Sequence, residues 1–173
     1  MELNKKWANH EIMVKWMRAF FQYLDRFYVE MHSATKLSDQ GFKIFKEVVF
    51  HPLCENSTAA IVEEIRKQRI GEEMIDLELL RASVHIFITL STGKLAQDGF
   101  LPRVNLDKAL LEQTALYYEA KSKEIMDSTN LIDYLRVSDK YRRDEQNRVE
   151  QLLTWDVGQE VLKVFRREML IKP

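Results

Sequence analysis

The chain has 173 residues, of which 46% are hydrophobic, so it is long enough to enclose a core within the usual size of one domain. Its 26 basic and 27 acidic residues nearly cancel, which excludes a global electrostatic attraction to nucleic acid or to an anionic membrane. The single cysteine, Cys54, excludes an intramolecular disulfide and a cysteine-cluster metal site.

Long helices with short connections are predicted throughout, because the chain holds only five glycines and three prolines and no alternating pattern lasts long enough for a strand. Apolar residues recur three and four positions apart in each segment. The seven predicted helices cover residues 4–31, 38–51, 56–71, 74–90, 104–127, 131–155 and 157–171. His51-Pro52 is predicted to end the second helix, and Asn56 to Thr58 to cap the third. The irregular segment 93–102 is the best candidate for a mobile loop.

Targeting signals are not found in the sequence. Its N-terminus lacks the apolar stretch of a signal peptide, and no uncharged apolar run reaches about 18 residues. We therefore expect a soluble cytoplasmic or nuclear protein that contains no membrane segment.

No motif for catalysis, metal binding or nucleotide binding is found. The four histidines form no HxxxH or HExxH pair, and the isolated glycines form no phosphate-binding loop. The carboxylate pairs Glu63-Glu64, Glu72-Glu73 and Asp144-Glu145 are adjacent in sequence and point in different directions, which favours a solvated surface. Cys54 with His51 is the one nucleophile and base pair that the sequence alone does not exclude. We therefore expect no enzyme, no cofactor and no bound metal.

The first predicted helix is apolar on two sides. One stripe consists of Met13, Met17, Phe20, Leu24, Tyr28 and Met31, and is expected to face the core. A second consists of Trp16, Phe20, Tyr23 and Phe27. Two interpretations remain open. Either the helix is central and buried on both sides, or the second stripe, with Arg26 beside it, is a docking surface of the aromatic and arginine content typical of interfaces.

Several segments resemble the cullin family, in the same order along the chain. Trp7 to Val29, WANHEIMVKWMRAFFQYLDRFYV, resembles the end of the first cullin repeat, where a YLDR segment is followed by an aromatic residue. The most specific match is IVEEIRKQRIGEEMIDLELLRASVHIF, residues 61–87. The other matches are GFKIFKEVVF (41–50), LLEQTALYYEAKSKEIM (110–126) and the segment from DYL to DEQNRVEQLL (133–153). The resemblance therefore covers nearly the whole chain.

The resemblance implies a stalk of five-helix repeats stacked end to end. Residues 1–31 would be the last helix of the first repeat, residues 35–155 the complete second repeat, and residues 157–173 the first helix of the third. The implied function is a non-catalytic scaffold segment of a cullin-RING ubiquitin ligase, which spaces a substrate adaptor from the catalytic end.

The resemblance also implies a partner. The string FFQYLDR, residues 20–26, is most similar to the cullin class that docks F-box proteins through a small BTB/POZ-fold adaptor. Tyr23 and Arg26 match the family positions that face this adaptor. With Trp16 and Phe27 on the same stripe, they form the expected partner-binding set. The family's second adaptor-binding helix has no counterpart here, so we expect weakened adaptor binding and self-association through the exposed first helix.

The sequence departs from the family pattern at Gln68, where the family usually has glutamate, and in the 93–102 loop. It also lacks the half of a cullin that binds the RING subunit. Two alternatives follow: an excised piece of a longer cullin, or a naturally short cullin-like regulator that competes for adaptor without forming a ligase.

Overall fold

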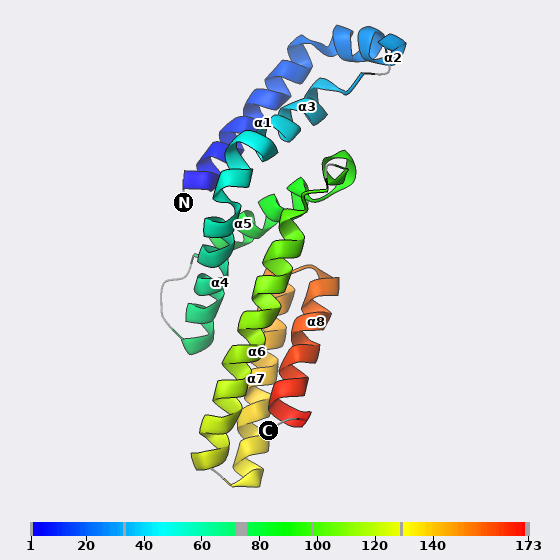
Figure 1. Cartoon of the computed structure of the whole chain (residues 1–173). Helices are drawn as coiled ribbons and strands as arrows, with labels where there is room; N and C mark the ends of the chain where they lie inside the picture. The colour runs from blue at the N-terminus through cyan, green and yellow to red at the C-terminus, as the bar shows by residue number, and fades with distance from the viewer. Residues whose placement is uncertain (1, 33, 72–75, 98, 129, 172–173) are drawn as a thin grey trace. The chain divides into compact units, whose positions relative to one another are not determined.

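The computed structural model describes residues 2–32, 34–71, 76–97, 99–128 and 130–171. Within these residues every regular element is a helix: eight α-helices, three short π-helical segments and two short 3₁₀ segments (Figure 1). The chain forms two compact units, Met1–Ile61 with Ala82–Arg103 and Val62–Arg81 with Val104–Pro173. The all-α prediction of about seven helices is confirmed, because α2 continues the first helix instead of forming a separate one.

The first helical stretch consists of α1 (Glu2–Phe20), the π-helical segment η1 (Leu24–Tyr28) and α2 (Val29–His32). The backbone N–H of Asp25 donates to the Phe21 carbonyl at 3.1 Å and carries the helical hydrogen bonding across the junction. No glycine or proline occurs within this stretch, so no residue in it breaks the helix.

Trp7 anchors the core of the first unit. Its ring centroid lies 5.5 Å from that of Phe42 on α3 (Leu37–Ile44) and 5.1 Å from that of Phe45, the first residue of η2 (Phe45–Phe50). These rings fix the face that α1 turns towards α3.

Gly41 on α3 allows the two helices to approach closely. A Cβ atom at this position would lie 2.9 Å from Cγ2 of the buried Val14, closer than carbon atoms normally come. His10 bonds the Gly41 carbonyl through Nε2 at 3.0 Å. The contact between α1 and α3 therefore depends on the missing side chain as much as on the aromatic rings.

The second helix does not end at His51-Pro52. The chain passes through the 3₁₀ turn η3 (His51–Leu53) directly into α4 (Cys54–Ile70). Pro52 lies in the first turn of η3, where its missing N–H removes no helical hydrogen bond. The capping role predicted for Asn56 to Thr58 is therefore wrong, because these residues lie inside α4.

Helix α5 (Leu77–Leu90) enters the first unit at Ala82, and the 3₁₀ turn η4 (Gly93–Ala96) also belongs to this unit. Its core includes a perpendicular contact between the rings of Phe50 and Phe87, with centroids 4.9 Å apart. Lys46 is fully buried and donates from Nζ to the Leu95 carbonyl at 2.5 Å. The segment predicted to be mobile is thus held at Leu95; residue 98 lies outside the described residues.

In the second unit, α6 (Pro102–Ser128), α7 (Leu131–Leu152) and α8 (Trp155–Arg166) lie side by side (Figure 1), and η5 (Arg167–Ile171) continues α8. Their shared core contains Tyr118, Ile125, Tyr134, Phe165 and Met169. The Tyr118 and Phe165 rings meet edge to face with centroids 4.7 Å apart. The Tyr134 hydroxyl donates to the Met169 carbonyl at 2.6 Å, so the buried polar group is satisfied.

None of the helices in the described part of the chain is both long and apolar enough to cross a bilayer. The assignment of residues 1–31, 35–155 and 157–173 to successive repeats concerns the register of the family and stays a prediction.

Candidate functional site

Four aromatic side chains project from the first helical stretch into solvent. Trp16 is 60% exposed, Phe20 78%, Tyr23 72% and Phe27 48%, which are high values for side chains of this size. We call this row the aromatic face. It contains three of the four residues predicted to bind a partner, and the fourth, Arg26, lies beside it.

The rings of the aromatic face are paired. The centroids of Trp16 and Phe20 lie 6.2 Å apart, and those of Tyr23 and Phe27 lie 4.6 Å apart. The guanidinium carbon of Arg26 lies 5.7 Å from the Phe27 ring centroid, within the range of a cation–π interaction. The helix thus places three of the predicted residues in the aromatic face, with Arg26 against its Phe27 ring.

The interpretation in which the first helix is buried on both sides is wrong. So is the prediction that its first stripe faces the core, since its members are exposed by 36 to 79%. The buried residues of α1 are Trp7 and Val14. The buried face of α1 was hard to identify from the sequence because it also carries the polar His10, whereas the exposed stripe is continuously apolar. Met17, Leu24 and Tyr28 of that stripe line an open hollow of about 440 Å³.

A basic hollow adjoins Arg26. It has a volume of about 520 Å³, and its charged lining consists of Lys15, Arg18, Arg26, Lys36 and Asp25. The Asp25 carboxylate accepts a hydrogen bond from the backbone N–H of Leu37 at 3.0 Å. Four cations therefore face one carboxylate that is already engaged, and this part of the surface favours an acidic partner.

The nucleophile pair that remained open has no support in the geometry. Cys54 is only 3% exposed, so a substrate cannot reach its thiol, and the ring of His51 packs on Phe100 with centroids 4.5 Å apart. No group of three or more metal-ligating side chains suited to an ion is found among the described residues.

The carboxylate pairs behave differently from one another. Glu63 and Glu64 are partly exposed and pair with Arg66 and Lys67 one turn further on, as a solvated surface predicts. Glu72-Glu73 lies outside the described residues. The prediction is wrong for Glu145, which is only 1% exposed although Asp144 beside it is exposed.

Glu145 is the centre of a buried ion network that sequence reasoning missed. Its carboxylate accepts from Arg69 of α4 through Nη2 at 2.6 Å and Nε at 3.3 Å, from Arg148 through Nη1, and from the Tyr118 hydroxyl at 2.6 Å. Arg69 also donates to Thr114 at 2.7 Å and to Gln113. The available signal was Arg69 on the apolar face of α4, since a buried arginine requires a buried acceptor.

The network shifts the ionisation of its members. Burial raises the pKa of Glu145, but the charges and hydrogen bonds of Arg69 and Arg148 outweigh it and hold that pKa below its ordinary value. Burial, followed by the Glu145 charge, raises the pKa of Tyr118, so its hydroxyl keeps the proton that it donates. The carboxylate is therefore ionised and the phenol neutral at physiological pH.

Comparison with known proteins gives one consistent result. The family model described as the cullin alpha solenoid domain matches residues 1–173. Cullin-2 of Arabidopsis thaliana is 31% identical over 170 residues, which cover 98% of this chain and 22% of that protein. Cullin-1 of Oryza sativa subsp. japonica is 30% identical over 169 residues, again 98% of this chain and 22% of the relative. Cullin-3A of Arabidopsis thaliana is 28% identical over 171 residues, with the same coverage of 98% and 22%.

The chain thus spans about a fifth of the length of these relatives. The family model, by contrast, covers the chain from end to end, and the helical architecture agrees with an α-solenoid. The chain belongs to the cullin family.

Proposed function

We propose that the protein is a non-catalytic scaffold segment of a cullin-RING ubiquitin ligase, and that it docks a BTB/POZ-fold adaptor of F-box proteins on its aromatic face. The helices would then hold this adaptor at a fixed distance from the catalytic end. The observation that carries the proposal is the exposure of Trp16, Tyr23 and Phe27 with Arg26 in one row. A scaffold of this kind requires no cofactor and no catalytic residue.

The aromatic face has the physical properties of an interface centre. Large aromatic side chains bury much apolar area when bound and lose few rotamers, so they contribute strongly to binding free energy. They project from a helix and not from a loop, which reduces the conformational entropy lost on binding. Ring pairs such as Tyr23–Phe27 further limit the conformations of the free protein.

The basic hollow next to Arg26 supports a partner with an acidic edge. Lys15, Arg18 and Lys36 would steer such a partner and speed its association, while the aromatic face contributes most of the affinity. The proposal therefore divides the surface into an anchoring part and a steering part.

The test is titration calorimetry with a purified F-box-type BTB/POZ adaptor. Tyr23→Ala combined with Arg26→Ala is expected to weaken binding by about 2 to 4 kcal/mol, a loss typical of interface hot spots. Tyr28→Ala is the matched control, because it removes another half-exposed tyrosine of the same helical stretch that is not part of the aromatic face. It is expected to change the affinity by less than about 0.5 kcal/mol.

Salt dependence separates the two parts of the surface. Lys15→Ala combined with Lys36→Ala is expected to slow association and to flatten its dependence on ionic strength, with little change in the dissociation rate. Equal losses from Tyr28→Ala and from the double variant would contradict the assigned face. No binding of the adaptor by the wild-type chain would contradict the adaptor proposal itself.

A further inference from the structure

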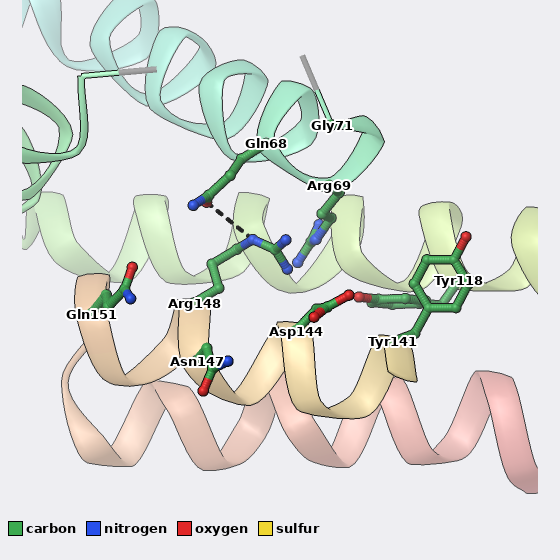
Figure 2. Close-up of a pocket in the computed structure, with 9 residues that line it drawn as sticks. All are labelled: Gln68, Arg69, Gly71, Tyr118, Tyr141, Asp144, Asn147, Arg148 and Gln151. Carbon is green, nitrogen blue, oxygen red and sulfur yellow. Dashed lines mark hydrogen bonds between the residues drawn. The ribbon is translucent and has the colours of Figure 1, made fainter. Parts of the chain in front are cut away.

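A polar pocket opens beside the buried ion network of the second unit (Figure 2). It has a volume of about 360 Å³, and α4, α6 and α7 all contribute to its wall. We propose that this pocket binds a small oxyanion, the phosphate or carboxylate group of a ligand, on the guanidinium group of Arg148. The proposal is independent of the adaptor surface, which lies on α1 and η1.

The first step concerns Glu145, whose single negative charge is shared between two arginines. Its Oε2 accepts from Nε of Arg69 at 3.3 Å, from the Tyr118 hydroxyl at 2.6 Å and from Nη1 of Arg148. Its Oε1 accepts from Nη2 of Arg69 at 2.6 Å. One carboxylate therefore faces two guanidinium groups, and only one nitrogen of Arg148 is bonded to it.

The second step follows the remaining nitrogen atoms of Arg148. Nε donates to Oε1 of Gln68 at 3.0 Å, and Nη1 donates to Glu145. Nη2 has no acceptor among the described residues. The side chain is only 10% exposed, and it lines the pocket. An arginine that is largely withdrawn from water, and that has a nitrogen without an acceptor, favours an anion in the pocket that it lines.

Neutral amide side chains also belong to the pocket wall. Because an arginine can only donate, the Gln68 oxygen must face Nε of Arg148, and its amide nitrogen then points away from that bond. Gln151 and Asn147 also line the pocket, and Figure 2 shows both on α7, the helix that carries Arg148. Amide N–H groups supplement a guanidinium in oxyanion binding and add no charge.

Asp144 is the one carboxylate among the described residues of the pocket wall. It is exposed, and Figure 2 shows it near Tyr118 and Tyr141, on the side away from Gln151. Its charge opposes an anion, so the site should be weak, with a dissociation constant in the millimolar range. This opposition supplies a test with a definite sign, because removing the charge of Asp144 must strengthen binding.

The experiment is an NMR titration that follows the arginine side-chain Nε–H signals and the backbone signals of α7. Inorganic phosphate and acetate are the two probes, each at constant ionic strength against chloride, and they distinguish phosphate from carboxylate chemistry. Saturable shifts at Arg148 and Gln151 are expected. Asp144→Asn should tighten binding about threefold to tenfold, and Gln151→Leu should weaken it severalfold.

Both substituted residues are surface-accessible, so the variants remain folded and the outcome is interpretable. Glu160→Gln on α8 is the matched control, since it also removes one exposed negative charge but lies outside the pocket wall. It should leave the dissociation constant within about twofold. Shifts spread over all exposed arginines, or the same tightening from Glu160→Gln as from Asp144→Asn, would overturn the proposal.

Discussion

The ion pair between Arg69 and Glu145 is almost completely withdrawn from water, with both side chains only 1% exposed. A pair of this kind owes its stability to geometry and to extra hydrogen bonds, because desolvation offsets most of the Coulomb attraction. Removing one partner is far more costly than the pair is worth, since a charge then remains buried without compensation.

Glu145→Gln is therefore expected to lower the free energy of unfolding by about 3 to 5 kcal/mol, because Arg69 and Arg148 lose the carboxylate that they share. Glu160→Gln, which breaks a surface pair with Lys163, should cost at most about 1 kcal/mol. Urea unfolding followed by circular dichroism measures both. Equal costs for the two variants would show that the network is not a buried charge centre.

The same residue gives a pH dependence with a fixed sign. The folded-state pKa of Glu145 lies below its ordinary value of 4.5, so the unfolded state binds the proton more readily. The stability contributed by Glu145 is fully present above pH 4.5 and is lost as the pH falls through the folded-state pKa. Urea midpoints of the wild type should therefore fall more steeply below pH 4.5 than those of Glu145→Gln; parallel curves would contradict the assignment.

At the scale of elements, the sequence located the helices better than their faces. Helical period and the scarcity of glycine and proline are local signals, and they placed the first helix at residues 4–31 against an observed stretch from Glu2 to His32. The buried face of α1 depends on which element packs there, and Phe42 and Gly41 of α3 decide this. Hydrophobic periodicity therefore selected the continuously apolar stripe, which is exposed.

The predicted helix end at Pro52 is wrong for a related reason, and the burial of Lys46 has the same kind of cause. A proline is a stop signal only if a helix would otherwise pass through it, and here a new 3₁₀ turn begins. A lysine is expected on the surface, because burying its charge requires partners inside the protein. Lys46 has two such partners, the Leu95 carbonyl and the Phe100 ring. Both depend on contacts with residues distant along the chain.

The effect of a substitution at Gly158 on α8 also depends on a contact with another helix, and it can be predicted from that contact. Glycine to alanine within a helix normally stabilises by up to about 1 kcal/mol. At Gly158 a Cβ atom would lie 2.2 Å from Cγ1 of Val149 on α7, and valine is stiff at χ1. We therefore expect Gly158→Ala to destabilise by about 1 to 3 kcal/mol in thermal unfolding. Gln159→Ala is the control and should be nearly neutral; stabilisation by Gly158→Ala would mean that the helices separate without cost.

At the scale of the whole molecule, composition and periodicity were sufficient to predict the all-α fold class. The matching sequence segments were sufficient to identify the family. The aromatic face was also recognised, because four large aromatic side chains at helical spacing exceed what one buried stripe requires. The proposed oxyanion pocket was not recognised from the sequence, because its walls come from three helices. Arg69, Tyr118 and Arg148 meet only after folding, and no spacing within one segment encodes their contact.

The exposed aromatic face leads to a prediction about association. Apolar side chains gathered on one surface favour burial against another protein, and in the purified chain a second copy is the available partner. We expect the weight-average mass in sedimentation equilibrium to rise between about 10 and 200 μM, as for a weak dimer. Phe20→Glu should abolish the rise, because a charge would then be buried in the contact. Leu116→Glu, at a residue of α6 that is 68% exposed, is the matched control and should leave the rise unchanged.

Adaptor and second copy would then compete for one surface. Adding the BTB/POZ-fold adaptor should convert the dimer into a one-to-one complex, and adaptor affinity measured by titration should fall as the concentration of the chain increases. A dimer that binds adaptor without dissociating would place self-association elsewhere on the molecule. A monomer at every concentration would show that the aromatic face is tolerated in water, and that its exposure alone does not drive association.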